Sequence, residues 1–346
     1  METNQLYLYG ITHNYYDPGQ FIELKKLGFQ VIQYEKISAI VAEKEYVSLE
    51  QTGKETLARL LIDHQKVLES LMEMGFSVLI PMKLGTYSKN KTEVRRILEI
   101  GYTLCLEILE KVGNMVEIDI AATWANFSEV LEMVVVDPEV IELREKLMLK
   151  GNSISTTDRM QIGKLVKDKL DKKGVQMKQQ IVARLGIHCK DVKQHELMND
   201  EMVANVAFLL NKAKIGSFEK TLDQLDKELN GELNFKFVGP LPCYSFYTLE
   251  VVELNFAQIE LAKNELGLQK QASAKEIKQA YFKKVKLAHP DMNSGDEDKA
   301  YFNSVNNAYR TITDYMQMVK QSSTDDLFYF TEKQVNENSM LVKIKE

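Results

Sequence analysis

The chain has 346 residues, of which 45% are hydrophobic and 27% are charged, and its formal net charge is −6. The length suits two or three domains, and these proportions are typical of a folded protein. The negative charge argues against the general basic footprint of a nucleic-acid-binding protein. No apolar stretch approaches the ~18–20 residues that a membrane span needs, and the N-terminal segment lacks a secretory signal pattern. We therefore expect a cytoplasmic protein without a membrane span.

The three cysteines and five histidines are scattered along the chain. Because no CxxC pair is present, we expect neither a zinc site nor a disulfide framework. Cys105 has the pattern of a core residue. His13, His64, His188 and His195 have no partner at the spacing of a metal site or a catalytic triad, so we interpret them as structural or exposed. We expect no catalytic residues, no metal and no cofactor.

Residues 1–125 are predicted to form a first α+β domain, in which strands are mixed with two helices. Thr52 and Glu55 have the spacing of a capping box, and Asn90 is the expected cap of the second helix, with Glu93 three residues on. The alternating segment 116–124 is expected to close this domain as its last strand. The expected strands cover 6–11, 29–43, 76–85 and 116–124, and the expected helices cover 52–75 and 91–111.

Residues 126–252 are predicted to form a second α+β domain that begins with a helical connection. Two strands within 192–211 are expected to pair across Asn199-Asp200. The segments FKFVGP and YSFYTLEVVEL are expected to finish the domain as strands. The expected helices cover 127–135, 138–149, 159–185 and 217–229.

Residues 253–321 are predicted to be all helix, and 322–346 form a C-terminal tail. The tail contains two short β-like runs, LFYF and MLVKI. A β-hairpin and a disordered tail both remain open for this segment.

The sharpest motif is His289-Pro290-Asp291, which stands between two predicted helices. Ser273 and Glu276 form a capping-box match, so the first helix starts just after Ser273 and ends at the proline. One face of this helix is apolar, with Ile277, Ala280, Tyr281, Val285 and Ala288. The opposite face is basic, with Lys275, Lys278, Lys283 and Lys286, whereas Lys284 falls near the edge of the apolar stripe.

The second helix presents apolar residues at helical spacing, namely Phe302, Val305, Ala308, Tyr309 and Ile312. We therefore expect an antiparallel helix pair whose connecting loop projects the tripeptide beside the lysine face. Taken alone, a lysine-rich face is most often a solvated surface. Next to His-Pro-Asp in this context, a docking surface is favoured.

This arrangement resembles the J domain of DnaJ-type co-chaperones. The resemblance rests on LG at 266–267, EIKQAYFKKVKLAHPD at 276–291 and the F-x-x-V-x-x-AY pattern at 302–309. It implies that the tripeptide and the lysines dock on an acidic surface of a DnaK-type chaperone and stimulate its ATP hydrolysis. Asp291 would offer an anion to an arginine, His289 and Pro290 would hold the loop shape, and the lysines would steer association.

The chain departs from the best-known members of that family in three ways. Its J-like segment lies near the C-terminal end, and it has neither a Gly/Phe-rich linker nor cysteine-rich zinc repeats. We therefore expect it to deliver a specific client to the chaperone instead of binding unfolded chains in general.

A second resemblance covers roughly residues 5–252. LYLYGI, the segment 63–86, the segment 205–225 and the run FVGPLPCYSFYTLEV at 237–251 are similar to the GvpL/GvpF family of gas vesicle proteins. The family signature is carried here by Gly239, Pro240, Pro242, Tyr244, Ser245 and Phe246. At an earlier turn the sequence has Lys83-Leu84-Gly85 where the family favours Arg-Phe-Gly. The signature also suits a turn that sets the angle between two core strands.

Together the resemblances imply a fold and a function. The fold is α+β, with two small ferredoxin-like units followed by an all-α J-domain helical hairpin. The implied function is gas vesicle assembly, through contact with the hydrophobic shell protein, other gas vesicle accessory proteins and a DnaK-type chaperone. The main alternative is a J-domain adaptor for an unrelated cytoplasmic complex, and an enzyme ranks third.

Overall fold

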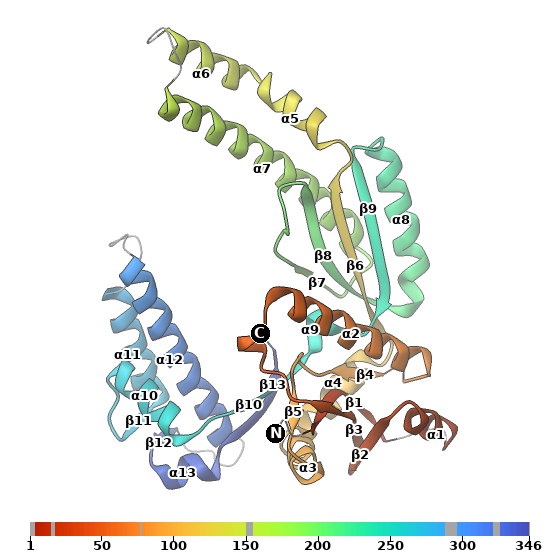
Figure 1. Ribbon diagram of the computed structural model, residues 1–346, viewed down its shortest axis with the longest axis vertical. Coiled ribbons are helices and arrows are strands. Elements are labelled where there is room, and N and C mark those ends of the chain that lie inside the picture. Colours follow the sequence, from red (N-terminus) through yellow and green to blue (C-terminus); the bar gives the residue numbers. More distant parts are fainter. Residues whose placement is uncertain are drawn as a thin grey trace. The chain divides into compact units, whose positions relative to one another are not determined.

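A computed structural model describes residues 4–14, 18–76, 78–149, 155–287, 296–320 and 326–345. The chain divides into two compact units, each built from segments that are distant in sequence (Figure 1). The first unit comprises Met1–Val67, Pro81–Ile108 and Thr248–Glu346, and the second comprises Leu68–Ile80 and Leu109–Tyr247. Within the described ranges, no helix is long and apolar enough to cross a membrane.

The first sheet is built around β1, which lies between β3 and β4. Its strands are β1 (Asn4–His13), β2 (Phe29–Tyr34), β3 (Ile37–Glu45), β4 (Leu79–Pro81) and β5 (Tyr87–Ser88). Their order is β2-β3-β1-β4, and β5 also pairs with β1. The turn between β2 and β3 passes through Glu35, whose φ of 48° fits a tight hairpin. The strands predicted at 6–11 and 29–43 are confirmed, whereas only Leu79–Pro81 of the expected strand 76–85 is a strand of this sheet.

Several helices precede, separate or follow the strands of this sheet along the chain. They are α1 (Pro18–Lys26), the 3₁₀-helix η1 (Leu49–Gln51), α2 (Lys54–Glu73), α3 (Lys91–Ile100) and α4 (Tyr102–Val112). The Asn90 side chain accepts a hydrogen bond from the Glu93 amide at 3.0 Å, which confirms the predicted cap. The helix predicted over 91–111 is in fact two helices, α3 and α4, which are separated at Gly101.

The second sheet contains four strands in the order β7-β8-β6-β9. They are β6 (Met115–Trp124), β7 (Asp191–Gln194), β8 (Met202–Asn211) and β9 (Leu233–Leu241). The expectation that 116–124 closes the first domain is therefore wrong, because β6 lies at the centre of this sheet between β8 and β9. The predicted pairing within 192–211 is confirmed by the antiparallel pair β7 and β8.

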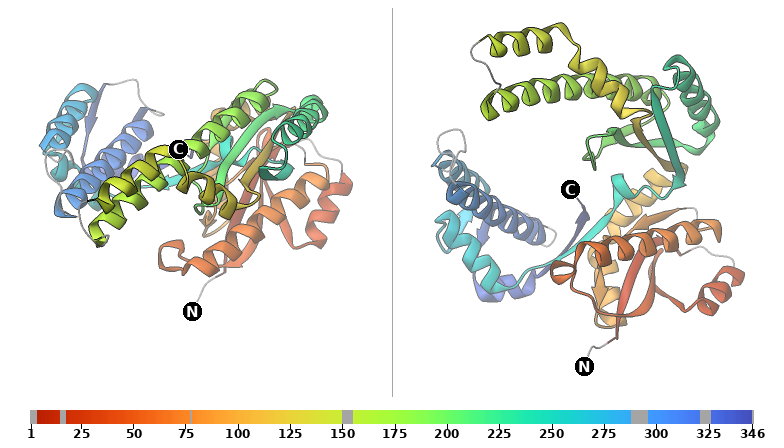
Figure 2. Two further views of the ribbon diagram at one scale, coloured as in Figure 1. Left: turned by 90° about the horizontal axis from the view of Figure 1, so that it is seen from above. Right: turned by 45° about the horizontal axis from the view of Figure 1, so that its top comes forward.

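Most helices of the second unit match the predicted helices closely, whereas two short ones at 212–214 and 244–247 were not predicted. They are α5 (Phe127–Val135), α6 (Pro138–Met148), α7 (Thr156–Gly186), η2 (Lys212–Lys214), α8 (Ile215–Glu228) and the short α9 (Tyr244–Tyr247). α7 starts at a capping box made by Ser155 and Asp158, and both α5 and α6 pack against it (Figure 2). Lys169 of α7 pairs with Asp137 at 2.7 Å and with Glu139 at 2.9 Å, at the start of α6.

The C-terminal part of the first unit is mainly helical, with α10 (Phe256–Leu266), α11 (Ala274–Leu287), α12 (Asp296–Lys320) and α13 (Glu332–Glu337). It also contains four short strands, β10 (Leu249–Glu253), β11 (Gln271–Ser273), β12 (Leu327–Tyr329) and β13 (Met340–Ile344). LFYF and MLVKI thus supply two strands, but a hairpin between them is wrong. β12 pairs with β11, and β13 pairs with β10.

One apolar core joins these C-terminal elements. It includes Ile259 of α10, Ile277 of α11, Ile312 of α12, Phe328 of β12 and Val335 of α13, all of which are buried. Two α+β parts are therefore followed by a mainly helical C-terminal region, as predicted. The expectation that 253–321 is all helix is wrong at β11, which lies within this range and pairs with β12.

Candidate partner-binding surfaces

The start of α11 is fixed by the predicted capping box. The Ser273 amide and hydroxyl donate to Glu276 Oε2 at 2.8 and 2.7 Å, and the Glu276 amide donates back to Ser273 Oγ at 3.3 Å. The hydrogen bonds from Ser273 lower the pKa of Glu276, so the carboxylate stays charged near the positive end of the helix. This cap sets the rotation of every later residue on α11.

The apolar face of α11 packs on α12, as its pattern predicts. Ile277 is buried, and the Tyr281 ring stacks on Tyr309 with 4.0 Å between ring centroids. The Tyr281 hydroxyl donates to Asn306 Oδ1 at 2.8 Å. On α12, Val305, Ala308 and Ile312 are buried.

The opposite face of α11 is basic and exposed. All four predicted lysines of this face are exposed, namely Lys275, Lys278, Lys283 and Lys286. Lys284 is only half-buried, which agrees with its predicted place at the edge of the apolar stripe. Phe282 is also exposed, and Lys278 Nζ lies 5.9 Å from the centroid of its ring. An exposed aromatic ring among cations suits a partner that offers both carboxylates and apolar surface.

His289, Pro290 and Asp291 lie outside the described residues. In the sequence they stand between Leu287, the last residue of α11, and Asp296, the first residue of α12. The predicted contacts of these three residues with a chaperone therefore stay predictions.

The family signature forms the end of β9 and the short helix α9. The Gly239-Pro240 peptide is cis, and Gly239 has a φ of 145°, a conformation that favours glycine. A Cβ at this position would lie 3.0 Å from the carbonyl oxygen of Glu117. The expected strand YSFYTLEVVEL is wrong at its start, because Tyr244–Tyr247 is helical and β10 begins only at Leu249.

Ser245 attaches this signature to β6 through the carboxyl group of Glu117, which was not among the predicted site residues. The Ser245 amide donates to Glu117 Oε2 and its hydroxyl donates to Glu117 Oε1, both at 2.7 Å. Glu117 is 1% exposed. Lys193 donates to the Ser245 carbonyl oxygen at 3.0 Å, and the His195 ring lies 3.1 Å from the Ser245 hydroxyl.

Burial and the neighbouring Asp119 carboxylate raise the pKa of Glu117 to about 8. Burial also raises the pKa of Asp119. Both groups lie on one face of β6 because they are two residues apart. The sequence does contain a signal for this site. A strand as apolar as VEIDIAATW is expected to be buried on both faces, so its two carboxylates at alternate positions are expected to be buried as well.

The histidines and cysteines show no metal site among the residues described. No group of three or more His, Cys, Asp or Glu side chains lies close enough there to hold a metal ion. His64 is buried, with Nδ1 2.8 Å from the Tyr7 hydroxyl, and burial lowers its pKa to about 4. Cys105 is a buried free thiol, as expected of a core residue.

Comparison with known proteins gives two matches on separate parts of the chain. The family described as gas vesicle synthesis protein GvpL/GvpF matches residues 5–248, and the DnaJ domain matches residues 264–318. Gas vesicle protein F of Nostoc sp. (strain PCC 7120) is 25% identical over 245 residues, which are 70% of this chain and 97% of that relative. The mitochondrial DnaJ homolog 1 of Saccharomyces cerevisiae is 35% identical over 81 residues, which are 23% of this chain and 16% of that protein.

The fold has a counterpart among solved structures. The crystal structure of the gas vesicle protein GvpF from Anabaena sp. PCC7120 aligns with a TM-score of 0.56 and 20% identity, covering 70% of this chain and 95% of that one. At this identity the likeness shows the fold alone. The sequence match to the family covers far more than half of the chain, and the DnaJ match follows it. The protein therefore belongs to the GvpL/GvpF family of gas vesicle proteins and carries a DnaJ domain C-terminal to the family region.

Proposed function

We propose that this protein is an accessory factor of gas vesicle assembly that binds the hydrophobic shell protein and recruits a DnaK-type chaperone. The carrying observation is that one chain combines a GvpL/GvpF match over 5–248 with a DnaJ match over 264–318. The protein acts in the cytoplasm and at the gas vesicle as a binding protein, with no catalytic step of its own. Other gas vesicle accessory proteins are further partners.

In this proposal, the exposed lysines of α11 bind the DnaK-type chaperone. Like charges gathered on one helix face create a local positive potential even though the whole chain is negative. That potential steers an acidic partner into contact and raises the association rate. Phe282 then adds apolar contact area at the centre of the basic face.

The need to bind the shell protein follows from the apolar surface of that protein. A small subunit with a large apolar surface aggregates while it waits to be assembled. A protein that binds this subunit and also recruits a chaperone keeps it available for addition. The alternative, an adaptor for an unrelated complex, predicts a chaperone contact of the same kind with no capture of shell protein.

The test uses the full chain, because β10 pairs with β13 and a cut near residue 252 would divide β10 itself. The variant His289→Gln should lose nearly all stimulation of ATP hydrolysis by the host's DnaK-type chaperone while its circular dichroism stays unchanged. In cells that form vesicles, it should give fewer vesicles and more insoluble shell protein. Equal stimulation by both proteins would refute the chaperone link, and a full chain that captures no shell protein would refute the client.

A further inference from the structure

The C-terminal strand β13 is paired along its whole length with β10. The register runs from Glu253 opposite Met340 to Leu249 opposite Ile344. Two further backbone bonds extend the pair, from the Lys345 amide to the Thr248 carbonyl oxygen at 2.8 Å and from the Leu254 amide to the Ser339 carbonyl oxygen at 3.0 Å. β10 is the strand that leads from the GvpL/GvpF region into the DnaJ helices. The DnaJ helices therefore lie, in the sequence, between two strands that close on each other.

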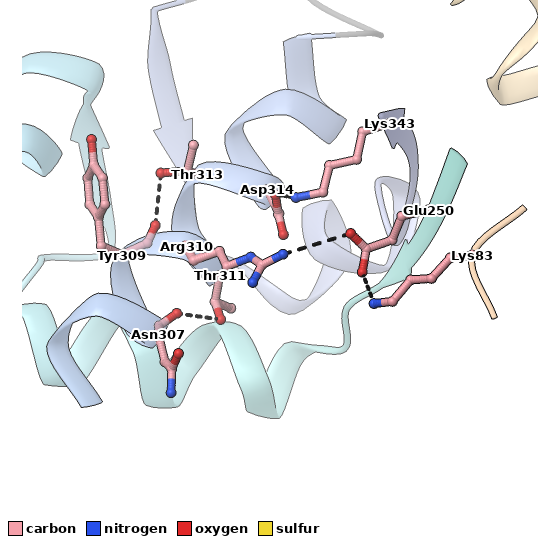
Figure 3. Close-up of polar contacts among 9 residues, drawn as sticks. All are labelled: Lys83, Glu250, Asn307, Tyr309, Arg310, Thr311, Thr313, Asp314 and Lys343. Carbon is pink, nitrogen blue, oxygen red and sulfur yellow. Dashed lines mark hydrogen bonds and ion pairs between the residues drawn. The ribbon is translucent and has the colours of Figure 1, made fainter. Parts of the chain in front are cut away.

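Both strands are tied to α12 of the DnaJ region by charged side chains. Lys343 of β13 forms an ion pair with Asp314, and these side chains are only 11% and 9% exposed. Arg310, one helical turn earlier on α12, lies 3.8 Å from Glu250 Oε2 of β10. Figure 3 shows these contacts side by side on one stretch of α12. An ion pair this well buried orients its two elements, since separating it leaves a charge without its counterion.

The same two strands are also tied to the GvpL/GvpF part of the first unit. Glu250 Oε1 pairs with Lys83, so Lys83 and Arg310 both reach one carboxylate (Figure 3). The Lys83 amide donates to the Leu249 carbonyl oxygen at 2.7 Å. Lys83 begins the turn where the GvpL/GvpF family favours Arg-Phe-Gly, and here its charge is used within the chain.

β13 lies close to the backbone of Gly101, at a position where a side chain would not fit. A Cβ on Gly101 would lie 2.9 Å from Val342 Cγ1, a distance that real Cβ atoms do not reach. Val342 is 1% exposed, and its branched side chain has little rotamer freedom. The Arg96 side chain of α3 also donates to the Ser339 hydroxyl at 3.4 Å, just before β13. The absence of a side chain at Gly101, between α3 and α4, thus leaves room for Val342 of β13.

We propose that β13 is an intramolecular clamp that holds the DnaJ region on the GvpL/GvpF region, with the bare backbone at Gly101 as its seat. β13 contacts α12 on one side through Lys343 and the α3–α4 junction on the other through Val342. The DnaJ helices are thereby mounted at two points, at β10 where the chain enters them and at β13 where it leaves. This role of the C-terminal segment goes beyond the proposed function and does not rest on it.

The test is a mutant cycle in the full chain, read by hydrogen exchange of the β10 and β13 amides. Gly101→Ala overfills the seat, so exchange at 249–253 and 340–344 should become roughly five- to a hundredfold faster. Val342→Ala removes the opposing methyl groups and gives the baseline for the double variant. Gly101→Ala combined with Val342→Ala should exchange within about threefold of Val342→Ala alone, because the 2.9 Å contact with Val342 Cγ1 is then removed. The contacts at 3.2 Å with Val342 Cβ and the Ile97 carbonyl oxygen remain and require only small shifts.

Two internal controls separate release of the clamp from misfolding. Amides of β3 in the first sheet and of α12 in the DnaJ region should keep their protection in every variant. The transverse relaxation rates of these amides, measured by NMR, report how fast each region tumbles. In Gly101→Ala the rates should fall for α12, because the released DnaJ region tumbles faster, and should stay unchanged for β3. Unchanged exchange in Gly101→Ala would overturn the proposal. Faster exchange that Val342→Ala does not rescue would overturn it as well, since the seat would then not be the cause.

Discussion

Replacing Glu117 by glutamine should make the second unit much less sensitive to rising pH. Glutamine has the shape of the protonated carboxyl group and does not titrate. Its carbonyl oxygen can accept from the Ser245 amide, and its NH2 group can donate to the Ser245 hydroxyl oxygen, which reverses the direction of that second bond. In the folded protein Glu117 keeps its proton up to about pH 8, whereas the unfolded chain loses it near 4.5. Between these values the folded state binds more protons, so the free energy of unfolding falls as pH rises. The stabilisation by the protonated Glu117 is fully present below the pKa of the unfolded state, and it is lost as the pH rises through the pKa of the folded state.

The size of the effect follows from the width of this window. One pKa unit corresponds to about 1.4 kcal/mol, so the rise from pH 6 to pH 8 removes at most about 3 kcal/mol. Asp119 shares the site and takes part of the titration, which makes roughly 1–2 kcal/mol a realistic difference. A loss of that size is a large fraction of the stability of an ordinary domain.

Trp124 provides the assay, because it is the single tryptophan of the chain and lies on β6 with Glu117. It is 6% exposed, and Lys173 Nζ lies 5.3 Å from its ring, so its fluorescence should change when this sheet opens. Urea unfolding followed at Trp124 should show a falling midpoint between pH 6 and pH 8 in the wild type and a nearly flat one in Glu117→Gln. Glu219→Gln, an exposed carboxylate of α8, is the matched control and should behave as the wild type. Equal pH dependence in Glu117→Gln and the wild type would refute the reasoning.

Three further changes test other parts of the structure. Gly239→Ala should destabilise the second unit by about 1–3 kcal/mol, because its Cβ meets the Glu117 carbonyl oxygen and its φ is strained for alanine; an unchanged urea midpoint would contradict this. Tyr315→Phe removes the hydroxyl that donates to the Tyr329 carbonyl oxygen at 2.6 Å. The free energy of opening measured by hydrogen exchange at the α12 amides should fall by about 1–3 kcal/mol, and an unaltered exchange rate would count against this bond. The exposed charges of α11 can be reversed by Lys278→Glu, Lys283→Glu and Lys286→Glu together. This variant should associate more slowly with a DnaK-type chaperone, and most of the salt dependence of the association rate between about 50 and 150 mM should be lost. An unchanged salt dependence would show that the lysine face is only a solvated surface.

Most features set by neighbouring residues could be predicted from the sequence. The Thr52–Glu55 capping box is an exception, because α2 begins at Lys54 and the Thr52 hydroxyl donates to the Ser48 carbonyl oxygen. The Asn90 cap, the Ser273 capping box and the exposure of the α11 lysines are all confirmed, because each depends on residues within one or two helical turns. Periodicity alone decides which side chains share a helix face. The candidate chaperone surface could therefore be predicted as far as the described residues extend.

Features set by distant partners could not be predicted in this way. The alternation in 116–124 correctly indicated a strand, but its sheet depends on β8 and β9, which lie far along the chain. The role of Glu117 depends on Ser245, and nothing near Glu117 in the sequence indicates that partner. Likewise β13 was seen as a β-like run, but its pairing with β10 depends on contacts that local patterns do not contain.

The pairing of β10 with β13 also orders events during synthesis. β13 is translated after every element that it contacts, at a rate of about 5–20 residues per second. The surface around Gly101 and the outer edge of β10 therefore stay open until the DnaJ helices have been made. A nascent chain that stalls inside the DnaJ region exposes an uncovered apolar seat and an unpaired strand edge, the kind of surface that chaperones and proteases recognise. The β10–β13 pair can therefore form only after the DnaJ helices have been made, so a truncated chain exposes surface that the full chain covers.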